Sequence, residues 1–238
     1  MNIENKETQT YFFPDDINAK GNIRASKVNL DLTKKIEAQE YPCLGAKAAI
    51  NNNQYRLGIY GKMGEESTTM ALGDDLRAYI KETLATESKY MSMIAVFIDE
   101  ITSEIDFENR LWMQLQKLYD NEKNKQPWDP SVSSNPQEIG FSFSFNGQAF
   151  FVVGLNPYSS RKSRRFGYSA MAFNLHRQFE QLRAMDMYEK MKNVIREREL
   201  SYDGSINPML KDHGEGLEAP QYSGRKVDKD WECPFHTD

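Results

Sequence analysis

Apolar residues recur along this chain with two different periods, which divide it into strands and helices. Alternating or continuous short apolar runs are typical of strands, and apolar residues three or four positions apart are typical of one helix face. The first pattern predicts strands over residues 54–60, 91–97, 141–145, 148–153 and 169–173. The second predicts helices over residues 74–88, from 107 to before 127, and from 174 to about 200.

The clearest local signal is a hairpin around Asn146-Gly147. Aromatic residues alternate with serines from Phe141 to Phe145, and an apolar strand follows from Gln148. Asn-Gly is preferred in the two-residue type I′ turn, because both residues of that turn adopt a positive φ. We therefore expect the two segments to pair as antiparallel strands.

The ends of the chain are less patterned than its middle. Residues 1–38 are polar and predict an N-terminal arm, with a short helix indicated between Leu30 and Ile36. Residues 201–238 contain scattered Gly and Pro but keep aromatic residues such as Trp231. This composition favours a packed wrapping or lid over disorder.

The predicted elements follow the order β-α-β-α-β-β-β-α, which indicates an α/β fold. Residues 39–238 contain neither an internal repeat nor a convincing linker. We therefore predict one domain over these residues, with a mixed β-sheet flanked by helices and a long irregular C-terminal segment.

Composition limits the classes of partner. The formal net charge is −5, so wholesale binding to nucleic acid or to an anionic membrane surface is not expected. No apolar run approaches the roughly 20 residues of a membrane-spanning helix. The polar N-terminus contains no hydrophobic stretch that resembles a signal peptide. These features predict a cytoplasmic protein.

The chain has two cysteines, Cys43 and Cys233. They form no CxxC pair, which excludes a zinc site built mainly from thiolates. Either thiol can still be a metal ligand or a nucleophile, and a small buried apolar side chain is the alternative role. Small residues and Lys47 follow Cys43 closely, so its thiolate can be stabilised and a large planar cofactor can approach it.

Cations gather in residues 154–166, which we call the arginine-rich loop. The loop contains Ser159, Ser160, Arg161, Lys162, Ser163, Arg164 and Arg165. Guanidinium groups beside an apolar core repel one another unless an anion lies among them, and their planar fork suits carboxylates and phosphates. We therefore predict that an acidic group binds at this loop.

The three histidines, His176, His213 and His236, are too widely spread to make a convincing zinc triad. His176 follows Asn174, which we expect to cap the predicted helix. The imidazole can then face the end of the sheet near the arginine-rich loop, or it can simply hydrogen-bond a neighbour. The sequence contains no GxGxxG, Walker A, GxSxG or HExxH motif, so these patterns assign no reaction.

Several longer motifs follow one another in the C-terminal half. They are Asn156-Pro157-Tyr158-Ser159-Ser160-Arg161, Arg164-Arg165-Phe166, residues 172–183, residues 204–210, Asp212-His213-Gly214, residues 221–225 and residues 231–235. Together with Tyr41-Pro42-Cys43 upstream, these motifs resemble the YqcI/YcgG family over roughly residues 40–236.

This resemblance implies a haem-dependent N-oxygenase. Characterised members of the family oxidise guanidine or amine nitrogens, and L-arginine is one substrate. The chain would accordingly bind haem b and use O₂ and an external electron donor to hydroxylate a small amino-acid-like substrate. The implied iron ligand is Cys43 or His176.

The resemblance also assigns roles to other residues. Haem propionates or a substrate carboxylate would be bound by Ser160, Arg161, Arg164 and Arg165. Glu180 or Asp212 would hold a cationic guanidinium through a bidentate pair. The implied catalytic residues are Asn156, Glu180 and His213. A homodimer remains open as an assembly.

Asn156 departs from the family pattern, in which we expect a histidine before the Pro-x-Ser-Ser-Arg sequence. Asparagine can donate a hydrogen bond to bound oxygen but is a poor iron ligand. A non-catalytic haem- or anion-binding sensor or carrier is therefore the alternative function. Binding of a phosphorylated small molecule without iron is a third hypothesis.

Overall fold

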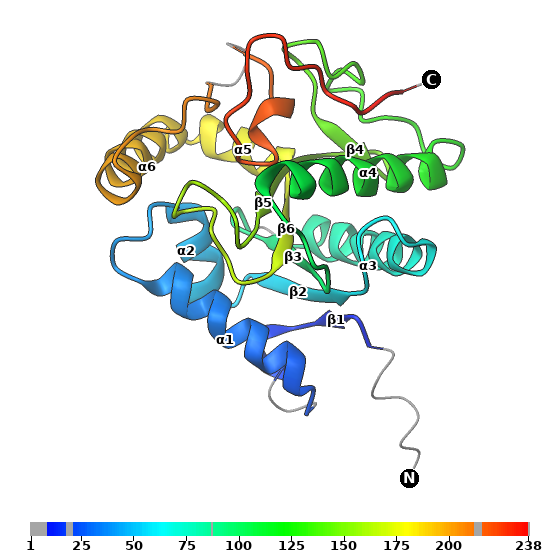
Figure 1. Cartoon of the computed structure of the whole chain (residues 1–238), viewed down its shortest axis with the longest axis horizontal. Helices are drawn as coiled ribbons and strands as arrows, with labels where there is room; N and C mark the ends of the chain where they lie inside the picture. The colour runs from blue at the N-terminus through cyan, green and yellow to red at the C-terminus, as the bar shows by residue number, and fades with distance from the viewer. Residues whose placement is uncertain (1–8, 18–20, 87, 212–215, 238) are drawn as a thin grey trace.

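The computed structural model describes residues 9–17, 21–86, 88–211 and 216–237. An open mixed sheet in the order β1-β2-β3-β6-β5-β4 runs through the middle of the molecule, with helices on both sides (Figure 1). Its six strands are β1 (Tyr11–Phe12), β2 (Tyr55–Tyr60), β3 (Ser92–Phe97), β4 (Phe143–Phe145), β5 (Gln148–Leu155) and β6 (Ser169–Leu175).

The connections explain why the sheet is mixed. β2 and β3 are parallel and are joined through α3 (Glu66–Leu84), whereas all other neighbours are antiparallel. β4, β5 and β6 form a meander that inserts β6 beside β3. The predicted hairpin is confirmed, since Asn146 and Gly147 have φ of 50° and 71°. The predicted fold class, a single α/β domain, is confirmed as well.

Helices cover both faces of the sheet. α3 and α4 (Glu104–Glu122) pack on one face, where Leu76, Phe107 and Leu111 are fully buried. On the opposite face, α1 (Ile23–Glu37) and α2 (Leu44–Asn51) pack against residues that include Leu57 and Ile94. Figure 1 shows α1 and α2 on one side of the sheet and α3 and α4 on the other.

The predicted N-terminal arm contributes regular structure to this fold. β1 pairs antiparallel with β2 at the edge of the sheet. α1 is longer than the helix predicted near Leu32, because its buried positions Ala25, Val28, Leu32 and Ile36 recur over four turns. Asn22 caps α1 by accepting the Ala25 N–H, at 3.0 Å.

The long helix predicted from residue 174 to about 200 is instead two helices. α5 spans His176–Ala184 and α6 spans Tyr188–Asp203, and Asp186 between them has a φ of 55°. The predicted cap was also wrong, since Leu175 occupies the N-cap position of α5. The Asn174 side chain belongs to β6 and donates to the Phe151 carbonyl across the ladder, at 3.3 Å.

The C-terminal segment packs against the sheet, as its aromatic residues predicted. Phe235 and Cys233 are buried beside α4, and the Tyr222 ring stacks on Trp112 at a centroid distance of 5.4 Å. The Tyr222 carbonyl accepts the Gly154 N–H at 2.7 Å, next to the open edge of β5. A Cβ on Gly154 would lie 2.8 Å from this carbonyl, so the close approach requires glycine.

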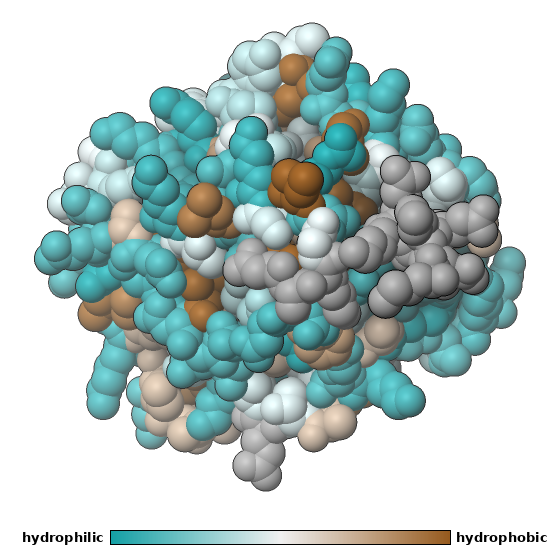
Figure 2. Space-filling view, turned by 90° about the horizontal axis from the view of Figure 1, so that it is seen from below, coloured by the Kyte–Doolittle hydropathy of each residue, from teal (hydrophilic) through white to brown (hydrophobic). Residues whose placement is uncertain are grey.

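The outer surface is largely hydrophilic where it can be seen from below, with scattered hydrophobic residues (Figure 2). Ile23 and Leu30 on the outer side of α1 are among the most exposed apolar side chains, at 85 % and 66 %. Within the described ranges, no helix has the length and apolar content needed to cross a bilayer.

Candidate functional site

A cavity of about 320 Å³ lies on the sheet face that carries α2. Its floor consists of side chains from three adjacent strands, β3, β6 and β5, which include Ile94, Ala172, Phe151 and Val153. Its walls come from α2, α5, α6 and the C-terminal segment. Most of these side chains are apolar, and the volume falls in the range of small-molecule pockets.

Cys43 lies in the cavity wall at the start of α2. It occupies the N-cap position, where its Sγ accepts the Ala46 N–H at 3.4 Å. Burial raises the pKa of the Cys43 thiol, while the Ala46 N–H and the nearby charge of Arg164 act in the opposite direction. The other cysteine, Cys233, is buried in the core on the far face of the sheet, which separates it from this site.

Arg164 is the residue of the arginine-rich loop whose guanidinium lines the cavity. Its Nη1 lies 3.1 Å from the Gly154 carbonyl, and its Nη2 lies 3.3 Å from the Gln221 carbonyl. Among the described residues, no carboxylate forms an ion pair with Arg164. Burial lowers the pKa of Arg164, but a guanidinium remains charged at neutral pH. The cavity wall therefore carries a cation whose side-chain hydrogen bonds go to backbone carbonyls.

Other polar groups of the arginine-rich loop bind protein groups, some of which lie far away in the sequence. Arg161 pairs with Glu199 at 2.9 Å and with Asp203 at 3.4 Å, both on α6. Arg165 donates to the Ser159 carbonyl, and the Ser160 N–H donates to Glu104. None of Ser160, Arg161 and Arg165 is among the residues that line the cavity. The sequence predicted an acidic group at this loop, and carboxylates of the protein itself, those of Glu199, Asp203 and Glu104, occupy much of that role.

Asn156 holds the shape of the arginine-rich loop. Its Oδ1 accepts the Tyr158 N–H at 2.9 Å, and its backbone bonds to Arg164 and Phe166 on the returning strand. The side chain is buried, and it is absent from the cavity lining. In this structure, Asn156 fixes the turn that places Arg164 in the cavity wall.

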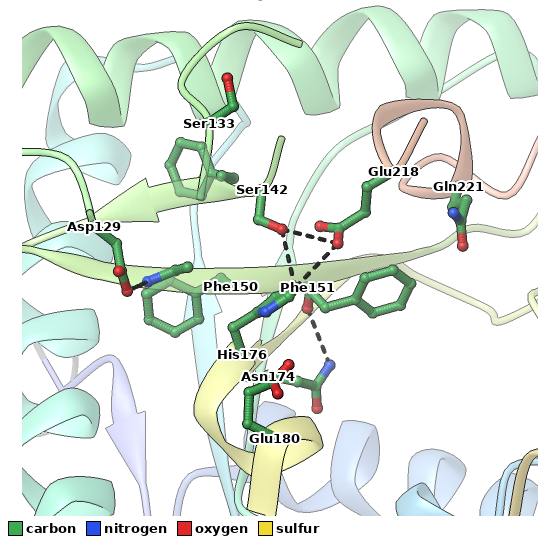
Figure 3. A network of polar contacts seen from close by, with 12 residues as sticks. Asp129, Ser133, Ser142, Phe150, Phe151, Asn174, His176, Glu180, Glu218 and Gln221 are labelled. Atoms are coloured by element: carbon green, nitrogen blue, oxygen red, sulfur yellow. Dashed lines mark hydrogen bonds and ion pairs between the residues drawn. The ribbon is translucent and has the colours of Figure 1, made fainter. Parts of the chain in front are cut away.

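A buried polar network forms the end of the cavity nearest His176 (Figure 3). The His176 Nε2 lies 3.0 Å from Ser142 Oγ and 3.1 Å from Glu218 Oε2, and these two oxygens are 2.9 Å apart. The Tyr222 hydroxyl lies 2.6 Å from Glu218 Oε1. All four side chains are at most 7 % exposed. His176 and Glu218 line the cavity, whereas Ser142 and Tyr222 lie behind them.

Among the remaining predicted site residues, Glu180 lies outside this network. Glu180 is exposed on α5 and pairs with Arg183. Asp212 and His213 lie outside the described residues. Within the described part of the chain, no cluster of three or more His, Cys, Asp or Glu side chains could hold a metal ion. Haem iron needs only an axial ligand from the protein. The absence of such a cluster therefore concerns metal ions held by protein side chains alone, and not haem.

Sequence reasoning missed Ser142, Glu218, Tyr222 and Glu199. Ser142 and Glu218 lie 76 positions apart, so no local pattern joins them. The one available signal is that Tyr222 falls inside a motif, residues 221–225, that resembles the family. The distant carboxylates could not be assigned to the site without the fold.

Comparison with known proteins identifies the family. The model described as "YqcI/YcgG family" matches residues 32–236. The chain belongs to the YqcI/YcgG family. All cavity-lining residues, from Leu32 to Gln221, fall within the matched range. The cavity is therefore built entirely from the part of the chain that the YqcI/YcgG family shares.

Two curated relatives from Bacillus subtilis (strain 168) are similar along most of their length. The uncharacterized protein YqcI is 29 % identical over 218 residues, which cover 86 % of this chain and 84 % of YqcI. The uncharacterized protein YcgG is 27 % identical over 210 residues, which cover 84 % of this chain and 82 % of YcgG. No solved structure matches the chain.

Proposed function

We propose that the cavity binds haem and that the protein hydroxylates a guanidine or amine nitrogen of a small amino-acid-like substrate. The observation that carries this proposal is a cysteine thiol, Cys43, together with a guanidinium, Arg164, that forms no ion pair with a carboxylate of the described residues, in the wall of one largely apolar cavity. Haem has an apolar face, an iron that accepts a soft ligand, and two propionates. The cavity offers a matching group for each of these features.

Cys43 suits the role of iron ligand better than His176 does. Its Sγ has one hydrogen-bond partner, the Ala46 N–H. The Nε2 of His176 lies within 3.1 Å of both Ser142 and Glu218, so iron binding through this atom would displace both contacts. A thiolate ligand pushes electron density onto haem iron and favours O–O cleavage.

The side chains around the cavity would bind, orient and shield the substrate. Arg164 would bind a haem propionate or a substrate carboxylate, whereas Arg161 and Arg165 remain with their protein partners. The inner face of α6, with Met191 and Ile195, covers the cavity and would exclude water. N-hydroxylation transfers one oxygen atom to nitrogen and releases the other as water. An external donor must therefore supply an electron pair, and a pair of protons must reach the cavity.

The cofactor assignment is tested by the optical spectrum of protein purified from haem-supplemented cells. We expect a Soret band whose intensity is lost in Cys43→Ala and retained in His176→Asn. Cys233→Ala is the matched control, since this thiol lies in the opposite core. A colourless wild-type protein, or a spectrum that follows His176 and not Cys43, contradicts the assignment.

The reaction is tested by supplying a reductant and O₂ to the haem-loaded protein with L-arginine and related amines. We expect hydroxylated product, detected by mass spectrometry as a gain of one oxygen atom. Arg164→Gln should reduce haem retention or raise KM, because the cavity wall then loses one of its cations. Haem binding without product for any of these amines would favour the sensor or carrier function instead.

A further inference from the structure

The hydrogen bonds around Tyr222 and Glu218 are compatible with either protonation state of Glu218. The Tyr222 hydroxyl accepts the Phe143 N–H at 2.9 Å. It has one proton to donate, yet it lies 3.0 Å from the Phe150 carbonyl and 2.6 Å from Glu218 Oε1. If Tyr222 donates to the carbonyl, a proton on Glu218 must fill the shorter contact. If the Tyr222 hydroxyl donates its proton to Glu218 instead, the Phe150 carbonyl has no hydrogen bond from Tyr222.

The other carboxyl oxygen of Glu218 faces a second proton carrier. Its Oε2 lies within 3.1 Å of both Ser142 Oγ and His176 Nε2, each of which can donate a hydrogen bond to it. The charged and the neutral form of Glu218 therefore each have partners in the same geometry. A carboxyl group that is satisfied in both protonation states can gain and lose a proton without rearrangement.

This geometry differs from a nucleophilic Ser-His-acid triad. In such a triad the serine contacts one ring nitrogen of the histidine and the acid contacts the other. Here Ser142 and Glu218 share the same Nε2. Ser142 also lies behind the cavity wall, so it cannot reach a bound molecule. The groups that reach the cavity are His176 and Glu218.

We propose that Glu218 and His176 form a general acid–base pair that exchanges protons with the molecule bound in the cavity. In one step the O–H bond of Glu218 breaks and a bond forms from that proton to an oxygen or nitrogen of the bound molecule. Next, the Nε2–H bond of protonated His176 breaks and an O–H bond forms on the carboxylate, which leaves a neutral imidazole that solvent reprotonates. Neither step changes an oxidation state. The inference rests on the proposed function, which requires protons to reach an otherwise apolar cavity.

Two replacements of Glu218 separate proton transfer from a structural role. Glu218→Gln keeps the length and the hydrogen bonds of the side chain but holds no exchangeable acid proton, whereas Glu218→Asp keeps the acid but shortens it. A proton-transfer role predicts that product formation falls about 100-fold or more in the Gln variant, and less in the Asp variant. A structural role predicts that Gln is tolerated as well as Asp or better. The matched control is Glu66→Gln, an exposed carboxylate on α3, on the sheet face opposite the cavity.

The solvent isotope effect on turnover distinguishes proton transfer from a structural role, because a change in packing alone does not alter it. In Glu218→Asp the proton has farther to travel, so we expect turnover to slow more in D₂O than it does for the wild type. The Soret band should be unchanged in all three variants. Wild-type turnover in folded Glu218→Gln, or an unchanged isotope effect in Glu218→Asp, overturns the inference. A wild-type protein without a Soret band overturns the proposed function instead.

A second measurement needs no cofactor. In protein with ¹⁵N-labelled histidine, the ring resonances of His176 are assigned with His176→Asn, since the chain has three histidines. Proton sharing predicts that Glu218→Gln changes the ring ¹⁵N shifts of His176 at neutral pH and that Glu218→Asp moves them back toward the wild-type values. If the ring ¹⁵N shifts of His176 do not change in Glu218→Gln, the proposed proton sharing between His176 and Glu218 is contradicted.

Discussion

Cys43 is held in an environment that suppresses its thiolate. Burial is the largest influence and raises its pKa, whereas the Ala46 N–H and the Arg164 charge favour the thiolate. Each unit by which a thiol pKa rises lowers the thiolate fraction about tenfold near neutral pH. Metal binding removes the proton, which is why this residue can be unreactive when free and still be a ligand.

The pH dependence of Cys43 labelling tests this description. In a Cys233→Ser background, we expect iodoacetamide to label Cys43 more slowly than free cysteine at pH 8, and faster as the pH rises. Arg164→Gln should slow labelling further, because the guanidinium stabilises the anion. Labelling at the rate of free cysteine at pH 7 would contradict a raised pKa.

Single residues also show where the sequence misled. The arginine-rich loop indicated a bound anion because its cations are adjacent in sequence. The carboxylates that neutralise Arg161 come from Glu199 and Asp203, about 40 positions later. Such partners are set by the fold and leave no local pattern. Arg164, which points into the cavity, could not be distinguished from its neighbours by sequence alone.

At the scale of elements, α6 is attached to the molecule mainly through its ion pairs. Glu199 is its one buried residue, and its face with Met191 and Ile195 lies over the cavity instead of packing into a core. Arg161 joins Glu199 and Asp203 near its C-terminal end. This helix was predicted to continue from α5, because apolar residues of both helices share one face. No Gly or Pro marks the break at Asp186.

Removing the Arg161 side chain should loosen α6. Arg161→Gln leaves two largely buried carboxylates without their cation, which costs about 3 kcal/mol or more. Amides of residues 188–203 should then exchange with solvent on the order of 100-fold faster in hydrogen-exchange mass spectrometry. Arg24→Gln, at an exposed position on α1, is the control and should leave their exchange unchanged. Equal protection in both variants would show that packing alone holds α6.

At the scale of the whole molecule, the order of strands along the chain was predictable and their order in the sheet was not. The spacing of apolar residues located β2 and β3, and the turn residues Asn146 and Gly147 located the β4–β5 hairpin. The insertion of β6 between β3 and β5 depends on long-range pairing that no window of sequence contains. The C-terminal segment was expected to pack on the domain. Its position beside β5 depends on a long-range contact, the hydrogen bond from the Gly154 N–H to the Tyr222 carbonyl, which the sequence does not reveal.

The C-terminal segment should carry a large part of the stability of the domain. Phe235 is fully buried among aromatic rings, so Phe235→Ala is expected to lower the free energy of unfolding by about 3–5 kcal/mol. Ile105→Ala, at a 56 % exposed position on α4, should change it by less than about 0.5 kcal/mol. Chemical denaturation measures both values. Similar midpoints for the two variants would mean that the segment is only loosely attached.

All three tryptophans lie on one side of the sheet. Trp112 contacts Trp231 and Phe235, and Trp128 contacts Phe235 as well. The cavity lies on the other side of the sheet. Intrinsic fluorescence therefore reports the C-terminal segment and α4, while absorption by a coloured ligand reports the cavity. Because a coloured ligand can also quench tryptophan emission by energy transfer, loading is read from the absorption of the ligand and folding from the emission of the ligand-free protein.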